Sequence, residues 1–122
     1  DSWQQVASMP QGRFWHAAAA VGGKIYVTGG AHDDGGGSVN SVCVYDPQAD
    51  AWAPLASMGI ARRRHAAAVV GGKLYVFGGC GTCADISTRH LGAAEVYDPA
   101  SDSWAQVTSL ASVRHSLVAV AL

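Results

Sequence analysis

The chain contains the same block twice, and this internal repeat restricts its fold more than any other feature. Residues 16–30 read HAAAAVGGKIYVTGG, and residues 65–79 read HAAAVVGGKLYVFGG, 49 positions later. Trp3 and Trp52 are separated by the same 49 positions. A repeat of about this length, with a glycine pair and a tryptophan in each copy, is typical of a β-propeller array in which each copy is one supersecondary unit.

Turn residues divide one repeat into four short strands. Ala66–Val70 is an apolar run, which favours a strand buried on both faces. Gly71-Gly72 suits a two-residue hairpin turn, because glycine adopts positive φ without steric cost. Leu74–Phe77 is rich in β-branched and aromatic residues and ends at a glycine pair. The third and fourth strands are expected at Ala93–Tyr97 and Ser103–Val107, and the four strands are called a, b, c and d.

The motif residues of both copies resemble those of kelch repeats. Each copy has a glycine pair, a Tyr-Asp-Pro and a tryptophan in the same order: Gly29-Gly30, Tyr45-Asp46-Pro47 and Trp52, then Gly78-Gly79, Tyr97-Asp98-Pro99 and Trp104. The resemblance covers essentially the whole chain. It implies blades of a β-propeller with strand a nearest the central axis, and a partner-binding rim on the side of the b–c and d–a connections.

We therefore expect an all-β fold, a segment of a kelch-type β-propeller with two complete four-stranded antiparallel blades and one orphan strand at each end. Residues 1–8 match the last strand of a preceding blade, residues 13–56 form blade one, residues 62–108 form blade two, and residues 113–122 match the first strand of a following blade. Two blades do not close a ring. Because the chain also lacks an initiator methionine, we expect a piece of a longer or processed protein, covered by further blades or by other chains.

Charges divide between the two sides of such blades, although the formal net charge is only −1. In a four-stranded meander, the b–c and d–a connections leave on one side and the a–b and c–d turns on the other. The first side, called the arginine-rich face, carries six arginines and three aspartates, whereas the second carries two lysines and five aspartates. The long loops also lie on the arginine-rich face. Because the arginine fork binds carboxylates and phosphates, this face suits an acidic partner.

The candidate partner-binding residues all lie on this face. Phe14-Trp15 has no aromatic counterpart at Arg63-Arg64, so it is a candidate exposed anchor. Arg13 and Arg62 stand three residues before a repeated histidine, a position that often belongs to the rim in kelch proteins. The whole set is Arg13, Phe14, Trp15, His32, Asp33, Asp34, Arg62, Arg63, Arg64, Arg89, His90 and Arg114.

Each group of arginines also has a structural interpretation. Arg13 and Arg62 can instead pair with backbone groups or an aspartate where the chain enters a blade. For Arg63, Arg64 and Arg89 the alternative is an ordinary solvated charge.

The sequence predicts neither a metal nor a cofactor. Cys80-Gly81-Thr82-Cys83 is compatible with half of a zinc site, a redox pair, a local disulfide or two loop thiols, but a metal needs further ligands. His16, His65 and His115 recur at the start of strand a, as packing residues would. The glycine pairs do not belong to a phosphate-binding P-loop string.

Composition excludes several classes of protein. Charged residues make up 14% of the chain, which does not favour a nucleic-acid partner, and no apolar stretch approaches the roughly 20 residues of a membrane span. Three unevenly spaced cysteines do not form a disulfide framework, so a cytoplasmic location is expected.

Two functions fit these features. The first is a kelch-type protein–protein interaction scaffold that presents the arginine-rich face to an acidic protein or peptide. The alternative is a segment of a propeller enzyme similar to galactose oxidase, with a copper site or a sugar pocket. No Ser-His-Asp or paired-carboxylate grouping is evident, so we expect a scaffold and not an enzyme.

Overall fold

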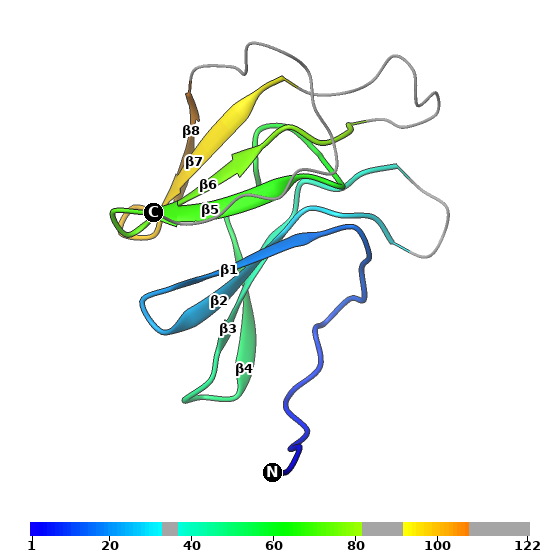
Figure 1. The fold of residues 1–122 in the computed structure, drawn as a ribbon, viewed down its shortest axis with the longest axis vertical. Coiled ribbons are helices and arrows are strands. Elements are labelled where there is room, and N and C mark those ends of the chain that lie inside the picture. The colour runs from blue at the N-terminus through cyan, green and yellow to red at the C-terminus, as the bar shows by residue number, and fades with distance from the viewer. Residues whose placement is uncertain (33–36, 82–91, 108–122) are drawn as a thin grey trace.

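The computed structural model describes residues 1–32, 37–81 and 92–107 of the chain (Figure 1). Within these ranges all regular structure is β-strand. The same ranges contain no helix that could cross a membrane.

Blade one is the first of two antiparallel sheets, with the strand order β1-β2-β3-β4. Its strands are β1 (Ala17–Val21), β2 (Lys24–Thr28), β3 (Val42–Asp46) and β4 (Ala51–Leu55). Each strand pairs with the next along the chain, which is the meander that the turn residues predict.

Blade two repeats this sheet with the order β5-β6-β7-β8. Its strands are β5 (Ala66–Val70), β6 (Lys73–Phe77), β7 (Ala94–Asp98) and β8 (Ser103–Val107). The expected all-β fold with two four-stranded antiparallel blades is confirmed. The predicted strand limits differ from the observed limits by at most one residue.

The a–b turns are the tight hairpins that the glycine pairs predict. Val21 pairs with Lys24 and Val70 with Lys73, so two glycines close each turn. Gly22 and its neighbour have φ of 56° and 79°, values that glycine adopts without strain.

The hydrophobic core lies between the two blades. Tyr26 and Val44 of blade one are buried against Leu74 and Tyr97 of blade two. The rings of Tyr26 and Tyr97 lie 5.9 Å apart, and Trp104 packs at the edge of the same cluster. Leu74 has no exposed surface, and burying such a side chain contributes about 2 kcal/mol. The core is thus shared between blades, so neither sheet buries its apolar residues alone.

Strand a is less buried than its apolar sequence predicts. In β1, Ala18 and Ala20 are exposed, whereas their counterparts in β5, Ala67 and Val69, are half-buried and pack against the core between the blades. The difference arises because β5 lies against blade one, while the described chain places no strand over the other face of β1. The prediction of burial on both faces therefore fails for β1.

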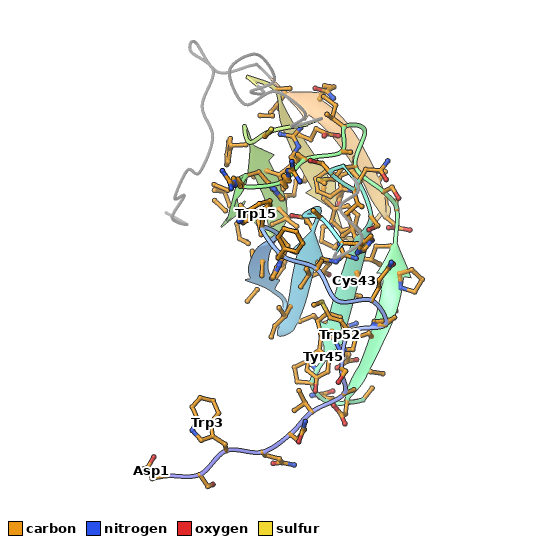
Figure 2. The ribbon with its side chains drawn as sticks, turned by 90° about the vertical axis from the view of Figure 1, so that its right-hand side faces the viewer. Asp1, Trp3, Trp15, Cys43, Tyr45 and Trp52 are labelled. Atoms are coloured by element: carbon orange, nitrogen blue, oxygen red, sulfur yellow. The ribbon has the colours of Figure 1, made fainter. Side chains whose placement is uncertain are left out.

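The N-terminal residues form no strand, in contrast to the strand expected at residues 1–8. Trp3 is fully exposed, with a relative accessibility of 101%, and projects away from both sheets (Figure 2). A strand is defined by its hydrogen bonds to a neighbouring strand, and neither of the two described sheets pairs with this segment. The strand expected at residues 113–122 lies outside the described residues.

The same set of bonds anchors the start of each blade. In blade one the Trp52 Nε1–H donates to the Ala7 oxygen at 2.8 Å, and the Ala7 N–H donates to Asp50 Oδ1 at 2.8 Å. The Tyr45 hydroxyl donates to the same Asp50 oxygen at 2.6 Å. Figure 2 shows Tyr45 beside Trp52. Blade two repeats all three bonds with Tyr97, Asp102, Trp104 and Ala56. We call this unit the Tyr-Asp-Trp clamp.

Candidate partner-binding face

The two kinds of connection lie at opposite ends of the blades, as the meander predicts. In Figure 1 the a–b and c–d turns lie on the left, and the d–a linker between the blades lies on the right with the b–c connections. Backbone hydrogen bonds join each d–a linker to the b–c connection beside it. Phe14 bridges to Ala31 and Arg63 bridges to Cys80, at 2.9–3.0 Å. These bridges give the arginine-rich face a fixed backbone.

Trp15, Arg63 and Arg64 form a cluster on this face. The Cζ atom of Arg64 lies 4.0 Å from the centre of the Trp15 ring, and that of Arg63 lies 5.1 Å from it. Both distances are within the range of cation–π attraction. Phe14 meets Trp15 edge-on, with ring centroids 4.6 Å apart. Trp15 still exposes 43% of its surface, so the cluster combines an accessible indole with two guanidinium groups. We call Trp15, Arg63 and Arg64 the Trp-Arg cluster.

The backbone of the Trp-Arg cluster is strained. Trp15 and Arg64 occupy equivalent repeat positions and have φ of 56° and 55°, in the left-handed region that bulky residues rarely adopt. The Arg64 N–H donates to the Trp15 oxygen at 2.8 Å, which joins the two strained residues directly. Strain of this kind persists only where the surrounding structure enforces it, and it concentrates at functional sites.

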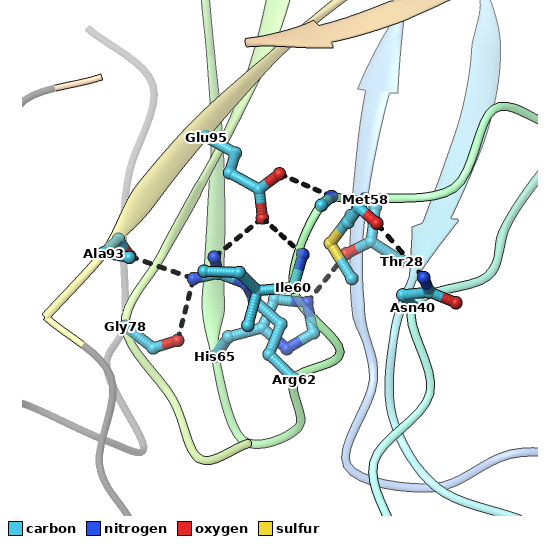
Figure 3. A network of polar contacts seen from close by, with 10 residues as sticks. Thr28, Asn40, Met58, Ile60, Arg62, His65, Gly78, Ala93 and Glu95 are labelled. Carbon is cyan, nitrogen blue, oxygen red and sulfur yellow. Dashed lines mark hydrogen bonds and ion pairs between the residues drawn. The ribbon is translucent and has the colours of Figure 1, made fainter. Parts of the chain in front are cut away.

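Arg62 is buried, unlike the two arginines that follow it. It has no exposed surface, and its Nη2 donates to Glu95 Oε2 at 2.8 Å (Figure 3). Its Nη1 donates to the oxygens of Gly78 and Ala93, both at 3.0 Å. The expectation that Arg62 faces a partner is therefore wrong, and the structural alternative applies.

Glu95 completes this network from strand β7. It is 1% exposed and accepts bonds from the Gly59 N–H at 2.7 Å and the Ile60 N–H at 3.3 Å (Figure 3). Burial lowers the pKa of Arg62 below its ordinary value, whereas the bond to Glu95 opposes this change. The carboxylate thus holds both the d–a linker and the buried guanidinium.

Arg13 occupies the equivalent position in blade one, and no carboxylate of the described residues binds it. Its Nη1 donates to the oxygens of Gly29 and Ser41 at 2.9 and 3.1 Å, so the backbone-pairing alternative describes this residue too. The residue at the position of Glu95 is Cys43, a buried free thiol. Burial raises the pKa of Cys43, and Arg13 partly offsets this effect.

His65 has the packing role that its repetition predicts. It is 5% exposed, and its Nε2 lies 2.7 Å from the Thr28 hydroxyl of the neighbouring blade. Burial lowers the pKa of His65 to about 3, and the charge of Arg62 acts in the same direction. The imidazole is therefore neutral near pH 7. Among the described residues, no group of three or more histidine, cysteine or acidic side chains could hold a metal.

The remaining predicted site residues have mixed outcomes. His32 is half-buried, and its Nδ1 lies 3.0 Å from the Gly12 oxygen, so it borders the linker. Cys80 is disulfide-bonded, which excludes the interpretation of two loop thiols for this residue. Five predicted residues lie outside the described ranges: Asp33, Asp34, Arg89, His90 and Arg114.

The comparisons with known proteins agree with this architecture. The profile of the KLHDC2/KLHL20/DRC7 Kelch-repeats domain matches residues 1–121. The chain is 35% identical over 109 residues to the F-box/kelch-repeat protein At2g44130 of Arabidopsis thaliana, which covers 88% of this chain and 26% of that protein. The solved structure of YjhT matches 90% of this chain and 41% of its own, with a TM-score of 0.76 and 22% identity. The chain thus spans less than half the length of either relative. Because the profile covers nearly every residue and the two blades carry the repeat motif in order, the chain belongs to the kelch-repeat family.

Proposed function

We propose that the chain is part of a kelch-type protein–protein interaction scaffold whose arginine-rich face binds an acidic protein or peptide. The Trp-Arg cluster supplies the main contacts. Trp15 is the aromatic anchor, and Arg63 and Arg64 bind carboxylates of the partner.

The observation that carries this proposal is the pair of arginines that lie over the exposed indole of Trp15. The ion pairs of the described residues are Lys24–Asp46 and Arg62–Glu95, so neither Arg63 nor Arg64 has an acidic partner there. A guanidinium stacked on an aromatic ring keeps its N–H edge available and loses little freedom when it binds a carboxylate. Aromatic and arginine side chains are also the residue types that dominate interface energies.

A decaglutamate peptide carrying a fluorescent label tests the proposal by anisotropy titration. We expect the full chain to bind this probe more tightly than decalysine, and more weakly at about 300 mM than at about 50 mM salt, because salt screens exposed charges. Replacing Arg63 and Arg64 together by Gln removes two half-buried cations, and losing two ion pairs with the probe corresponds to roughly a tenfold loss of affinity.

The matched control changes the same charge on the opposite side of the blades. Lys24 and Lys73 lie at the a–b turns, so their joint replacement by Gln should leave the affinity within about twofold of the wild type. Equal losses in the two double variants would mean that net charge, and not the Trp-Arg cluster, determines binding.

The cellular location is a separate matter. Disulfides persist mainly in oxidising compartments, and Cys80 is disulfide-bonded. This bond removes the support that the cysteine pattern gave to a cytoplasmic location.

A further inference from the structure

We propose that Glu95 is a positioning residue, which fixes the d–a linker so that Arg63 and Arg64 are held over Trp15 for the partner. The proposal rests on the proposed function, since it concerns how the Trp-Arg cluster is kept ready to bind. Glu95 touches neither arginine of the cluster and acts through Arg62 and the linker.

The linker before the cluster is held from three directions. Glu95 binds the N–H groups of Gly59 and Ile60 from β7 (Figure 3). The Arg62 side chain is bound to blade two, while its backbone N–H donates to the Val39 oxygen at 3.2 Å and its oxygen accepts from the Gly30 N–H at 2.8 Å. Arg62, the residue directly before Arg63, is thus bonded to both blades, and among the described residues its ion-pair partner is Glu95.

The fit around this tie leaves no room for adjustment. A Cβ atom built on Gly29 would lie 2.3 Å from the Arg62 oxygen, and one built on Gly59 would lie 2.9 Å from Glu95 Oε1. Glycine restricts the backbone less than any other residue type, so Gly59 does not fix the linker by its own conformational preference. Without the carboxylate, the linker would therefore regain a flexible residue four positions before Arg63.

In blade one, a proline instead of a carboxylate fixes the linker that precedes strand a. Pro10 stands 49 positions before Gly59, and Cys43 stands at the position of Glu95. A proline ring fixes φ and has no N–H to be satisfied, so this linker needs no acceptor. Trp15 nevertheless adopts the same left-handed backbone as Arg64. A proline in one blade and a buried carboxylate in the other thus both fix the linker ahead of an equivalent strained residue.

The test exchanges one arrangement for the other in the full chain. Glu95→Cys should lower the affinity for the decaglutamate probe at least fivefold, although Arg63 and Arg64 are unchanged. Adding Gly59→Pro to Glu95→Cys reproduces the blade-one arrangement in blade two and should restore most of the affinity. A Cβ atom at position 59 would lie 2.9 Å from Glu95 Oε1, and the cysteine of the double variant removes this close contact.

Leu74→Ala serves as the matched control for lost stability. Leu74 is fully buried in the core between the blades and belongs to neither the linker nor the Trp-Arg cluster, so this variant is destabilised while its folded fraction should bind as the wild type does. All titrations are made at a temperature where denaturation curves show each variant folded.

Three results would overturn the proposal. Full affinity in Glu95→Cys would show that the carboxylate does not position the cluster. A loss that Gly59→Pro fails to restore, or a loss equal to that of folded Leu74→Ala, would assign Glu95 to stability alone. If the wild type itself does not bind decaglutamate, the proposed function fails first, and this result is distinct from the other three.

Discussion

Arg13 and Arg62 occupy one position of the repeat, yet their guanidinium groups have different surroundings. Arg62→Met would leave the Glu95 carboxylate buried without its cation, and breaking such a pair costs about 3–5 kcal/mol. Arg13→Met would remove bonds to two backbone oxygens, a loss of about 1–2 kcal/mol. Urea denaturation of the two variants measures both values. Equal losses would contradict the assigned role of the carboxylate.

His65 gives the chain an expected dependence of stability on pH. Its pKa in the folded state is about 3, below the ordinary value of 6.5, so the unfolded chain binds the proton more readily. The contribution of His65 to the free energy of unfolding is therefore at its maximum above about pH 6.5. It decreases as the pH falls towards 3, by up to about 1.4 kcal/mol per pH unit.

Thermal melts of the wild type and His65→Gln at pH 7.5 and pH 5 test this assignment. The wild type should lose more stability at pH 5 than the variant does. A smaller loss arises in both proteins from His16, because burial also lowers the pKa of this residue. The lowered pKa values of Asp50 and Asp102 act below their ordinary value of 3.8 and add little at pH 5. Parallel melts in the two proteins would exclude His65 as the source.

The sequence predicts Arg63, Arg64 and Trp15 at the d–a connections, where the structure has them, but it does not separate Arg62 from its neighbours. Adjacent residues of one type look alike until the strand register decides which side chain points inward. A signal was present, because Glu95 lies between the apolar residues Ala94 and Val96, and the same position of β3 holds Cys43. A buried acidic side chain in the middle of a strand requires a cationic partner, and Arg62 is that partner.

Among the larger elements, the Tyr-Asp-Trp clamp explains why each repeat keeps its tryptophan. Trp104→Ala removes the bond to the Ala56 oxygen and part of the core between the blades, so we expect a loss of about 3 kcal/mol or more. Trp3 has the same motif position but is fully exposed, so Trp3→Ala should change stability by less than about 0.5 kcal/mol. Denaturation curves compare the two, and a large effect of Trp3→Ala would show that residues 1–8 pack on the blades.

The strands of both blades could be predicted because local signals agree with the fold. Glycine pairs, Tyr-Asp-Pro turns and apolar runs mark their limits independently of any distant contact. At residues 1–8 the local signals are present but do not suffice to form the expected strand. These residues match β8 closely, but a strand forms only beside a partner, and the described part of the chain places no strand beside it.

For the whole molecule, the internal repeat shows which surfaces require a neighbour. Ile25 of blade one is 41% exposed, whereas its counterpart Leu74 is fully buried by the adjoining blade. Val70 of blade two is 46% exposed, whereas its counterpart Val21 packs in the core between the blades. We therefore propose that further blades of the same propeller, or other chains, cover both outer faces.

Light scattering of the 122-residue chain over a range of concentrations tests this proposal. Repeat units bury their apolar faces only against neighbours, so we expect the average mass to rise above 12.5 kDa with concentration. Ile25→Lys combined with Val70→Lys should suppress this rise, because each places a charge on an outer face. If the average mass of the wild type stays at 12.5 kDa at every concentration, the two blades need no neighbour on their outer faces.

We propose above all that the arginine-rich face, and not the opposite side with the a–b and c–d turns, binds an acidic partner. Hydrogen–deuterium exchange of the full chain, at a concentration below self-association and with saturating decaglutamate, locates the bound surface directly. We predict slower exchange in the linker segments 13–17 and 61–66, which contain the Trp-Arg cluster, and unchanged exchange at turns 22–24, 71–73 and 98–102. Slower exchange at those turns alone, or no change at any segment under saturating probe, would contradict the claim.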